Sequence, residues 1–179
     1  QSVNKLQNEI AKNQINDSSK MMDFLNNVNN MSGVGASFKP ANIINQLGSG
    51  ADNQYDRLII ELTSMIFDKL FSNEKIPEHI RFLIGKLQLP ILKLALQNNE
   101  FFLNKDSSPR QFLDTLSSPE VVYSNEYIGR ISKVIDNLLL QEEMTTSFFS
   151  IALEQLKQIM QEQKDKEQII IKKSAAILE

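Results

Sequence analysis

The chain has 179 residues and a formal net charge of −3, from 19 lysines and arginines against 22 aspartates and glutamates. This length suits one domain of ordinary size, or a domain with a tail. The charges nearly balance and are spread along the chain, which argues against a general nucleic-acid binder, whose phosphate contacts need clustered cations. The absence of cysteine and the single histidine, His79, argue against a disulfide framework and a zinc cluster, so we expect no metal and no cofactor.

The sequence also bears on location. Arg81, Lys86 and Lys93 interrupt the most apolar run, so we expect no membrane span. There is no signal-peptide pattern, and a chain without cysteine fits the cytoplasm. Because the sequence starts at Gln1 and stops at Glu179 within a helical pattern, we expect a fragment of a longer protein.

Residues 1–52 are rich in asparagine, with weak amphipathic patterns separated by glycine and serine. They predict an N-terminal segment that is helical and partly ordered. A stronger pattern then begins: apolar residues recur at helical spacing from Gln54 to Phe71 and predict a core helix. We expect residues 53–160 to form a helical bundle domain.

The stretch from Ile80 to Gln97 is the densest apolar run. Its apolar residues cover more than one side of a helix, which predicts a helix surrounded by neighbours. Pro90 lies in its middle, where a proline clashes with the carbonyl four residues earlier and donates no amide hydrogen, so we expect a kink. The bent helix either holds a site on its polar seams or is bent only for packing, with its lysines in solvent.

Further helices are predicted from about Ser108 to Leu116 and from about Asn125 to Gln141, followed by a last helix from near Thr146 to the end of the chain. No segment has the pattern of a paired strand. We therefore predict an all-α fold, an irregular helical bundle around a central Pro-kinked helix, with a long C-terminal helix.

The last helix changes character along its length. A strong apolar stripe ends near Met160, a polar stretch follows, and five large apolar residues return at Ile169, Ile170, Ile171, Ile177 and Leu178. We expect residues 161–179 to project from the bundle toward another chain, or toward another part of the same protein. A segment that folds back, or a frayed end, is an equal alternative.

Catalytic patterns are weak. His79 follows Pro77 and Glu78 in the first turn of a predicted helix, which favours a surface position over a catalytic one. The adjacent Glu142 and Glu143 point to different faces of a helix and so hold no fixed separation for acid and base chemistry. We predict no catalytic residues. Arg110, at the start of a helix, could meet an anion, although a capped helix start with an arginine in solvent explains the same residues more simply.

Several short motifs in fixed order, between Tyr55 and Arg110, carry a resemblance to a known family: Met65-Ile-Phe-Asp, Ile76-Pro77, Leu83-Ile-Gly-Lys-Leu-Gln-Leu-Pro-Ile-Leu-Lys-Leu-Ala-Leu, Glu100-Phe-Phe and Ser108-Pro-Arg-Gln-Phe-Leu. The chain resembles the bacterial domain-of-unknown-function family 1631 over about residues 54–170. The resemblance implies a fragment of a longer protein without an established activity. Members typically have His at the position of Ser108 and a second Arg at that of Gln111, so a site built on that His in relatives is in doubt here.

Two functional hypotheses follow. The first is a non-enzymatic helical protein-protein interaction domain, part of a larger bacterial cytoplasmic protein. It binds another protein through the kinked central helix or the C-terminal helix, or associates with itself through the C-terminal helix. The alternative is a nucleotide or nucleic-acid binding regulatory module, in which four basic side chains converge: Arg81, Lys86, Lys93 and Arg110. The candidate interaction residues are these four together with Gln88, Ile170, Ile171 and Leu178.

Overall fold

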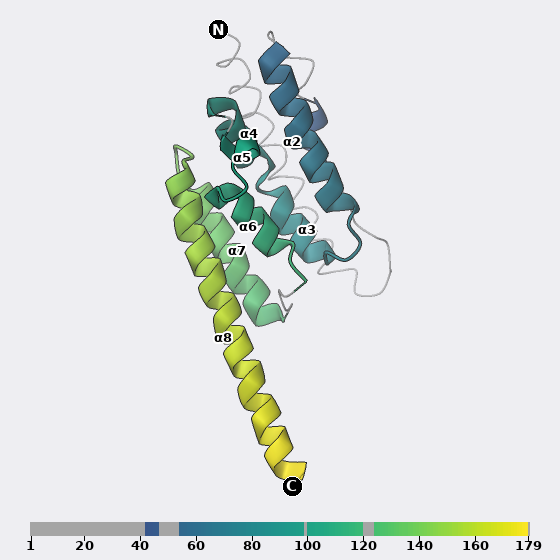
Figure 1. Cartoon of the computed structure of the whole chain (residues 1–179), viewed down its shortest axis with the longest axis vertical. Helices are drawn as coiled ribbons and strands as arrows, with labels where there is room; N and C mark the ends of the chain where they lie inside the picture. Colours follow the sequence, from purple (N-terminus) through teal and green to yellow (C-terminus); the bar gives the residue numbers. More distant parts are fainter. Residues whose placement is uncertain (1–41, 47–53, 99, 120–123, 179) are drawn as a thin grey trace. The chain divides into compact units, whose positions relative to one another are not determined.

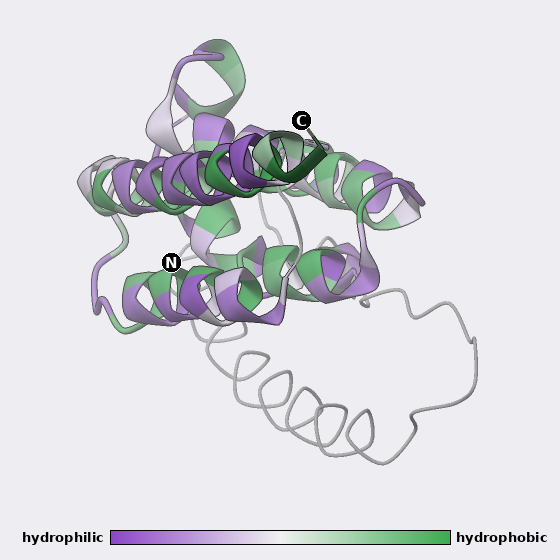
Figure 2. Cartoon of the chain, turned by 90° about the horizontal axis from the view of Figure 1, so that it is seen from below, coloured by the Kyte–Doolittle hydropathy of each residue, from purple (hydrophilic) through white to green (hydrophobic). Residues whose placement is uncertain are grey.

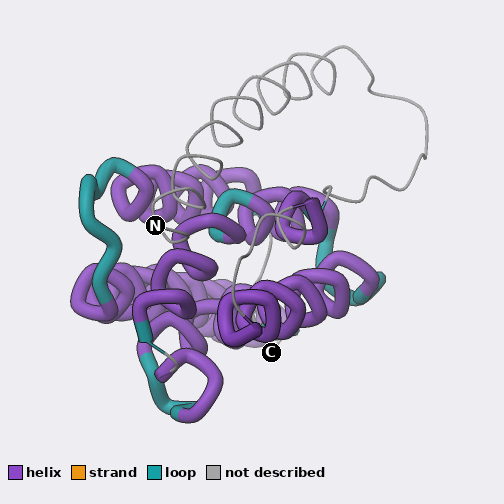
Figure 3. The backbone as a smooth tube through the Cα atoms, turned by 90° about the horizontal axis from the view of Figure 1, so that it is seen from above, coloured by secondary structure: helices purple, strands orange, loops and turns teal. Residues whose placement is uncertain are grey.

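A computed structural model describes residues 42–46, 54–98, 100–119 and 124–178. All regular elements in these ranges are helices, joined by loops and turns (Figure 3), which confirms the all-α prediction. Apart from residues 42–46, the predicted N-terminal segment lies outside the described residues. None of the helices described is both long and apolar enough to cross a bilayer.

The chain divides into two compact units, Gln1–Asn99 and Glu100–Glu179. This division falls within the predicted 53–160 domain, whose own boundaries stay predictions. Bands of hydrophobic and hydrophilic residues alternate along the helices (Figure 2), as expected of helices that each pack one face against a neighbour.

The first unit is built on α2 (Gln54–Ser72), which packs against α3 (Glu78–Gly85), α4 (Gln88–Gln97) and the short 3-10 helix η1 (Ile43–Gln46). The side-chain amide of Asn42 fixes η1 to α2 by donating to the Ser64 carbonyl at 2.9 Å and to the Asp68 carboxylate at 2.8 Å. Ile44 in η1 is fully buried. Both polar and apolar contacts therefore join η1 to α2. The sequence pattern had placed η1 in a separate N-terminal segment, residues 1–52, but it belongs to the first unit.

The central apolar run forms two helices rather than one kinked helix (Figure 1). At the turn between α3 and α4, the amides of Lys86 and Leu87 donate to carbonyls three residues back, at 3.2 and 3.0 Å. Pro90 is the third residue of α4, where its missing amide hydrogen costs no helical bond. In a continuous helix that amide would have bonded to the Lys86 carbonyl, so the helix ends before the proline and starts again.

The second unit contains α5 (Glu100–Leu103), α6 (Ser108–Leu116), α7 (Asn125–Leu139) and α8 (Thr146–Leu178). Both α6 and α7 pack against α8. The rings of Phe112 in α6 and Phe149 in α8, both fully buried, meet edge to face with centroids 5.8 Å apart. The predicted starts at Ser108, Asn125 and Thr146 agree with the structure, and the Ser124 side chain caps α7 by accepting from the Tyr127 amide at 3.5 Å.

Candidate interaction site

The first half of α8 is a core helix. Its buried residues recur every three or four positions and form one stripe: Phe149, Ala152, Leu153, Leu156, Ile159 and Gln163. This spacing places them on one side of the helix, the side that α6 and α7 cover. We call these six residues the proximal stripe.

Two ion pairs join α7 to α8 at the end of the proximal stripe. The Arg130 guanidinium lies 2.7 Å from the Glu162 carboxylate, and the Lys166 ammonium lies 3.2 Å from the Glu126 carboxylate. Because Glu126 is the second residue of α7, the pairs show that the helices run antiparallel and that α7 begins level with Lys166.

The charges of these pairs perturb one another. The hydrogen bond from Arg130 lowers the pKa of Glu162 below its ordinary value. The Glu126 carboxylate, together with Tyr127, raises the pKa of Lys166. The Lys166 nitrogen also lies 5.5 Å from the centre of the buried Tyr127 ring, within the range of a cation–π contact. Two ion pairs and a cation–π contact therefore hold α7 against α8 at this end of their interface.

Beyond Lys166, α8 extends past α6 and α7, the two helices of its own unit that pack against it (Figure 1). Every residue from Lys164 to Leu178 is exposed. The most exposed large apolar side chains are those of Ile177, at 84%, and Leu178, at 89%, while Ile170 and Ile171 are 62% and 66% exposed. Water therefore reaches most of the apolar surface on this end of the helix.

Four of these residues continue the proximal stripe. Ile170, Ile171, Ile177 and Leu178 follow Gln163 by about two or four helical turns, at 3.6 residues per turn, so they lie on the same side of α8. We call these four residues the distal stripe. Ile169, 52% exposed, lies on the opposite side of the helix. The side of α8 that faces α6 and α7 in the core is thus apolar again after α7 has ended.

The central helices hold four other candidate residues, and two of these, Arg81 and Gln88, are buried. Arg81 is 4% exposed and donates to the Phe71 carbonyl at 3.1 Å. Gln88 is 1% exposed and donates to the Gly85 carbonyl at 3.1 Å, across the break between α3 and α4. Both side chains therefore donate hydrogen bonds to backbone carbonyls at helix ends, where the carbonyl has no partner within its own helix.

The remaining basic candidates are partly exposed. The Lys86 ammonium lies 5.9 Å from the centre of the Phe82 ring, and Lys93 is on α4. Arg110 belongs to the other unit, where its guanidinium lies 5.8 Å from the centre of the Phe101 ring. The proposed basic site, in which Arg110 meets Lys86 and Lys93, stays a hypothesis, because these residues belong to different units. Arg81 is buried, so its guanidinium is not exposed for binding a ligand.

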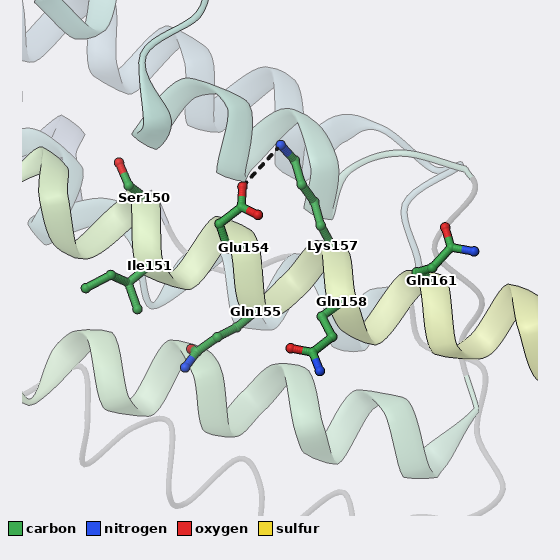
Figure 4. Close-up of a pocket in the computed structure, with 7 residues that line it drawn as sticks. All are labelled: Ser150, Ile151, Glu154, Gln155, Lys157, Gln158 and Gln161. Carbon is green, nitrogen blue, oxygen red and sulfur yellow. Dashed lines mark ion pairs between the residues drawn. The ribbon is translucent and has the colours of Figure 1, made fainter.

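Two open depressions lie on the second unit, and the sequence pattern indicated neither. One of about 710 Å³ runs along a single face of α8 (Figure 4), where Glu154 and Lys157 form an ion pair at 3.6 Å; it is lined by Ser150, Ile151, Glu154, Gln155, Lys157, Gln158 and Gln161. The other, of about 380 Å³, lies between α7 and α8 and is lined by Arg130, Lys133, Val134, Asn137, Gln155, Gln158 and Ile159. Since the first has walls from one helix only and the Arg130 charge in the second is paired with Glu162, neither resembles an enclosed ligand pocket.

The described residues include no cluster of three or more histidine or acidic side chains that could hold a metal ion. His79 is exposed in the first turn of α3, and partial burial lowers its pKa below the ordinary value, with Glu78 acting in the opposite direction. A lowered pKa keeps the imidazole neutral at neutral pH.

Comparison with known proteins identifies the family. The family model described as "Protein of unknown function (DUF1631) 2nd domain" matches residues 1–144. The chain belongs to the DUF1631 family. No curated protein and no solved structure matches it.

The DUF1631 match confirms the resemblance that the motifs carried, but its range differs at both ends. It includes the asparagine-rich first 52 residues, which the motifs left out, and it ends two residues before α8 begins. The family assignment therefore applies to the first unit and to α5, α6 and α7. The distal stripe lies outside the matched range and rests on its own geometry.

Proposed function

We propose that this DUF1631 domain is a non-enzymatic helical protein-protein interaction domain, part of a larger bacterial cytoplasmic protein. A partner helix docks on the distal stripe of α8. The observation that supports this proposal is the continuation of the apolar side of α8 past the start of α7, with Ile177 and Leu178 more than 80% exposed. The family description, which counts a second domain, supports a place within a larger protein.

Docking on the distal stripe packs the apolar face of a partner helix against the apolar face of α8. A partner helix takes the position along α8 that α7 occupies further back, and it removes four aliphatic side chains from water. Full burial of one such side chain contributes about 1.5–3 kcal/mol. Association costs about 4–15 kcal/mol in lost freedom of motion, which is as large as the gain from four such side chains. The distal stripe alone therefore supports weak binding at most, and a tight complex needs contacts elsewhere on the domain.

Photo-crosslinking from two isoleucine positions tests the proposal. The chain offers a matched pair on opposite sides of α8: Ile171 in the distal stripe, 66% exposed, and Ile169 outside it, 52% exposed. Each is replaced by p-benzoylphenylalanine in the full chain, in cells that make the protein naturally. We expect a covalent adduct with one defined polypeptide from position 171 and little or none from position 169, with the partner identified by mass spectrometry.

A binding measurement completes this test. The partner found at position 171 is titrated against the purified chain and against Ile171→Asp, which we expect to weaken binding at least about tenfold, because a carboxylate then lies in the apolar contact. Equal adduct yields from positions 169 and 171, or no adduct from either, would contradict the proposed function.

A further inference from the structure

Helix α2 carries a second apolar side besides the one in the core. Its buried residues, among them Ile59, Thr63 and Phe67, lie on the side that packs against α3, α4 and η1. Another apolar set follows a different side of the helix and is only partly covered: Tyr55, Leu58, Leu62, Met65 and Ile66. Tyr55, Leu58 and Met65 are 49%, 51% and 65% exposed. We call these five residues the α2 stripe.

We infer that the α2 stripe is the docking surface for an N-terminal segment of the same chain, residues 21–31. This segment lies outside the described residues. Its sequence, the point at which the chain joins α2 and the range of the family match all support the assignment, and none of them involves α8.

The sequence of residues 21–31 separates apolar from polar residues. At 3.6 residues per turn, one side of a helix over this range collects five apolar side chains, and the other side holds Asp23 and four asparagines. The five apolar residues are Met21, Phe24, Leu25, Val28 and Met31. So short a helix is marginal by itself in water, so it needs another apolar surface to pack against.

The chain joins α2 beside the stripe. The Asn42 side-chain amide donates to the Asp68 carboxylate at 2.8 Å, and Met65 lies three residues before Asp68, so the two are neighbours on the helix surface. Residue 31 precedes Asn42 by eleven positions, which span up to about 37 Å. The stripe is about 17 Å long, at 1.5 Å per residue. Residues 21–31 can therefore reach every part of it.

Attachment to the same chain favours this occupant over a separate protein. A segment joined by a short linker is present at an effective concentration of about millimolar. A separate partner must also lose its freedom of translation and rotation when it binds. A half-exposed stripe of five side chains is a modest surface, and it is better suited to holding a tethered segment than to capturing a free protein.

The family match includes the proposed occupant. The DUF1631 second-domain model begins at residue 1, so residues 21–31 belong to the same domain as α2. The neighbouring η1 sets a precedent, because Ile44 is fully buried and Asn42 is bonded to α2, although the sequence pattern grouped both with the N-terminal segment. Docking of residues 21–31 extends this covering of α2 from η1 to the stripe.

Hydrogen exchange tests the contact from the α2 side. In the purified full chain, the amides of residues 21–31 should exchange at least about tenfold more slowly than in a free peptide of that sequence. Leu58→Asp places a carboxylate in the contact and should abolish this protection, while slow exchange in α4 shows that the unit is still folded. Leu178→Asp makes the same change at an exposed leucine of α8 and should leave the protection unchanged.

Oxidation of Met65 tests the contact from the side of the segment, without any change in α2. Dilute peroxide oxidises an accessible methionine faster than a covered one. We expect Leu25→Asp to raise the oxidation rate of Met65 at least about fivefold, measured by mass spectrometry, and to leave that of the buried Met144 unchanged. Any of three results would overturn the inference: exchange of residues 21–31 as fast as in the free peptide, protection that survives Leu58→Asp in the folded chain, or equal oxidation of Met65 with and without Leu25→Asp.

Discussion

The two halves of α8 carry the same apolar spacing and differ in what covers them. In the first half, α6 and α7 bury the proximal stripe from Phe149 to Gln163. In the second half, the distal stripe continues in register and is exposed. Pattern alone therefore does not separate a core from an interface in this helix. The difference lies in where α7 starts, which the pair between Glu126 and Lys166 places level with the boundary between the halves.

The largest difference between the halves should appear in the stability of matched truncations. Leu156→Ala empties a fully buried position of the proximal stripe and should lower the free energy of unfolding by about 2–5 kcal/mol. Ile171→Ala removes an exposed side chain and should change it by no more than about 0.5 kcal/mol. Urea unfolding followed by circular dichroism, at a protein concentration that keeps the chain monomeric, measures both. A comparable loss at both positions would show that something covers the distal half even in the monomer.

Shortening the helix tests where the covered half ends. A chain that ends at Glu167 keeps both ion pairs and the buried Gln163, so it should unfold at the same urea midpoint as the full chain. A chain that ends at Met160 loses all of these contacts and should unfold at a lower midpoint. If the two shortened chains were equally stable, the contacts at Glu162 and Lys166 would contribute nothing measurable, and the boundary would lie nearer Met160.

The sequence predicted much of this comparison because local signals carry it. The start of α8 at Thr146, the apolar spacing up to Met160, and the return of apolar residues at Ile169 are all visible in the order of residues. The length of the covered part was not visible. It depends on which residue of α7 lies level with Lys166. The alignment of two packed helices cannot be predicted from the apolar spacing of one of them.

The same limit applies to the first unit. Proline chemistry predicted a disturbance near Pro90, and the structure places it at Lys86 and Leu87, where one helix ends and another begins. The burial of Arg81 was not predictable either, because the Phe71 carbonyl that it meets lies at the end of another helix. An arginine in a helical pattern is usually solvated, and only tertiary packing decides otherwise.

The smallest expected difference concerns two glutamates on either side of the boundary. Glu162 is hydrogen-bonded to Arg130, which lowers its pKa, so its stabilising contribution is present above the ordinary glutamate pKa of about 4.5 and is lost as the pH falls through the lower pKa of the folded chain. Glu167, one turn and a half further on, has no ion pair among those that the structure describes. Glu162→Gln should therefore lower the unfolding midpoint at neutral pH and lose that effect in acid, while Glu167→Gln should leave the midpoint unchanged at both.

Added salt sharpens this last measurement. Both carboxylates are at the surface, so the effect of Glu162→Gln should shrink at high ionic strength. Thermal or urea midpoints of the two variants and the parent chain, taken at pH 7 and near pH 3 with and without salt, measure it. Equal effects at the two glutamates would mean that the pair with Arg130 does not hold α7 against α8 in solution, and the start of the uncovered half would then move back toward Gln163.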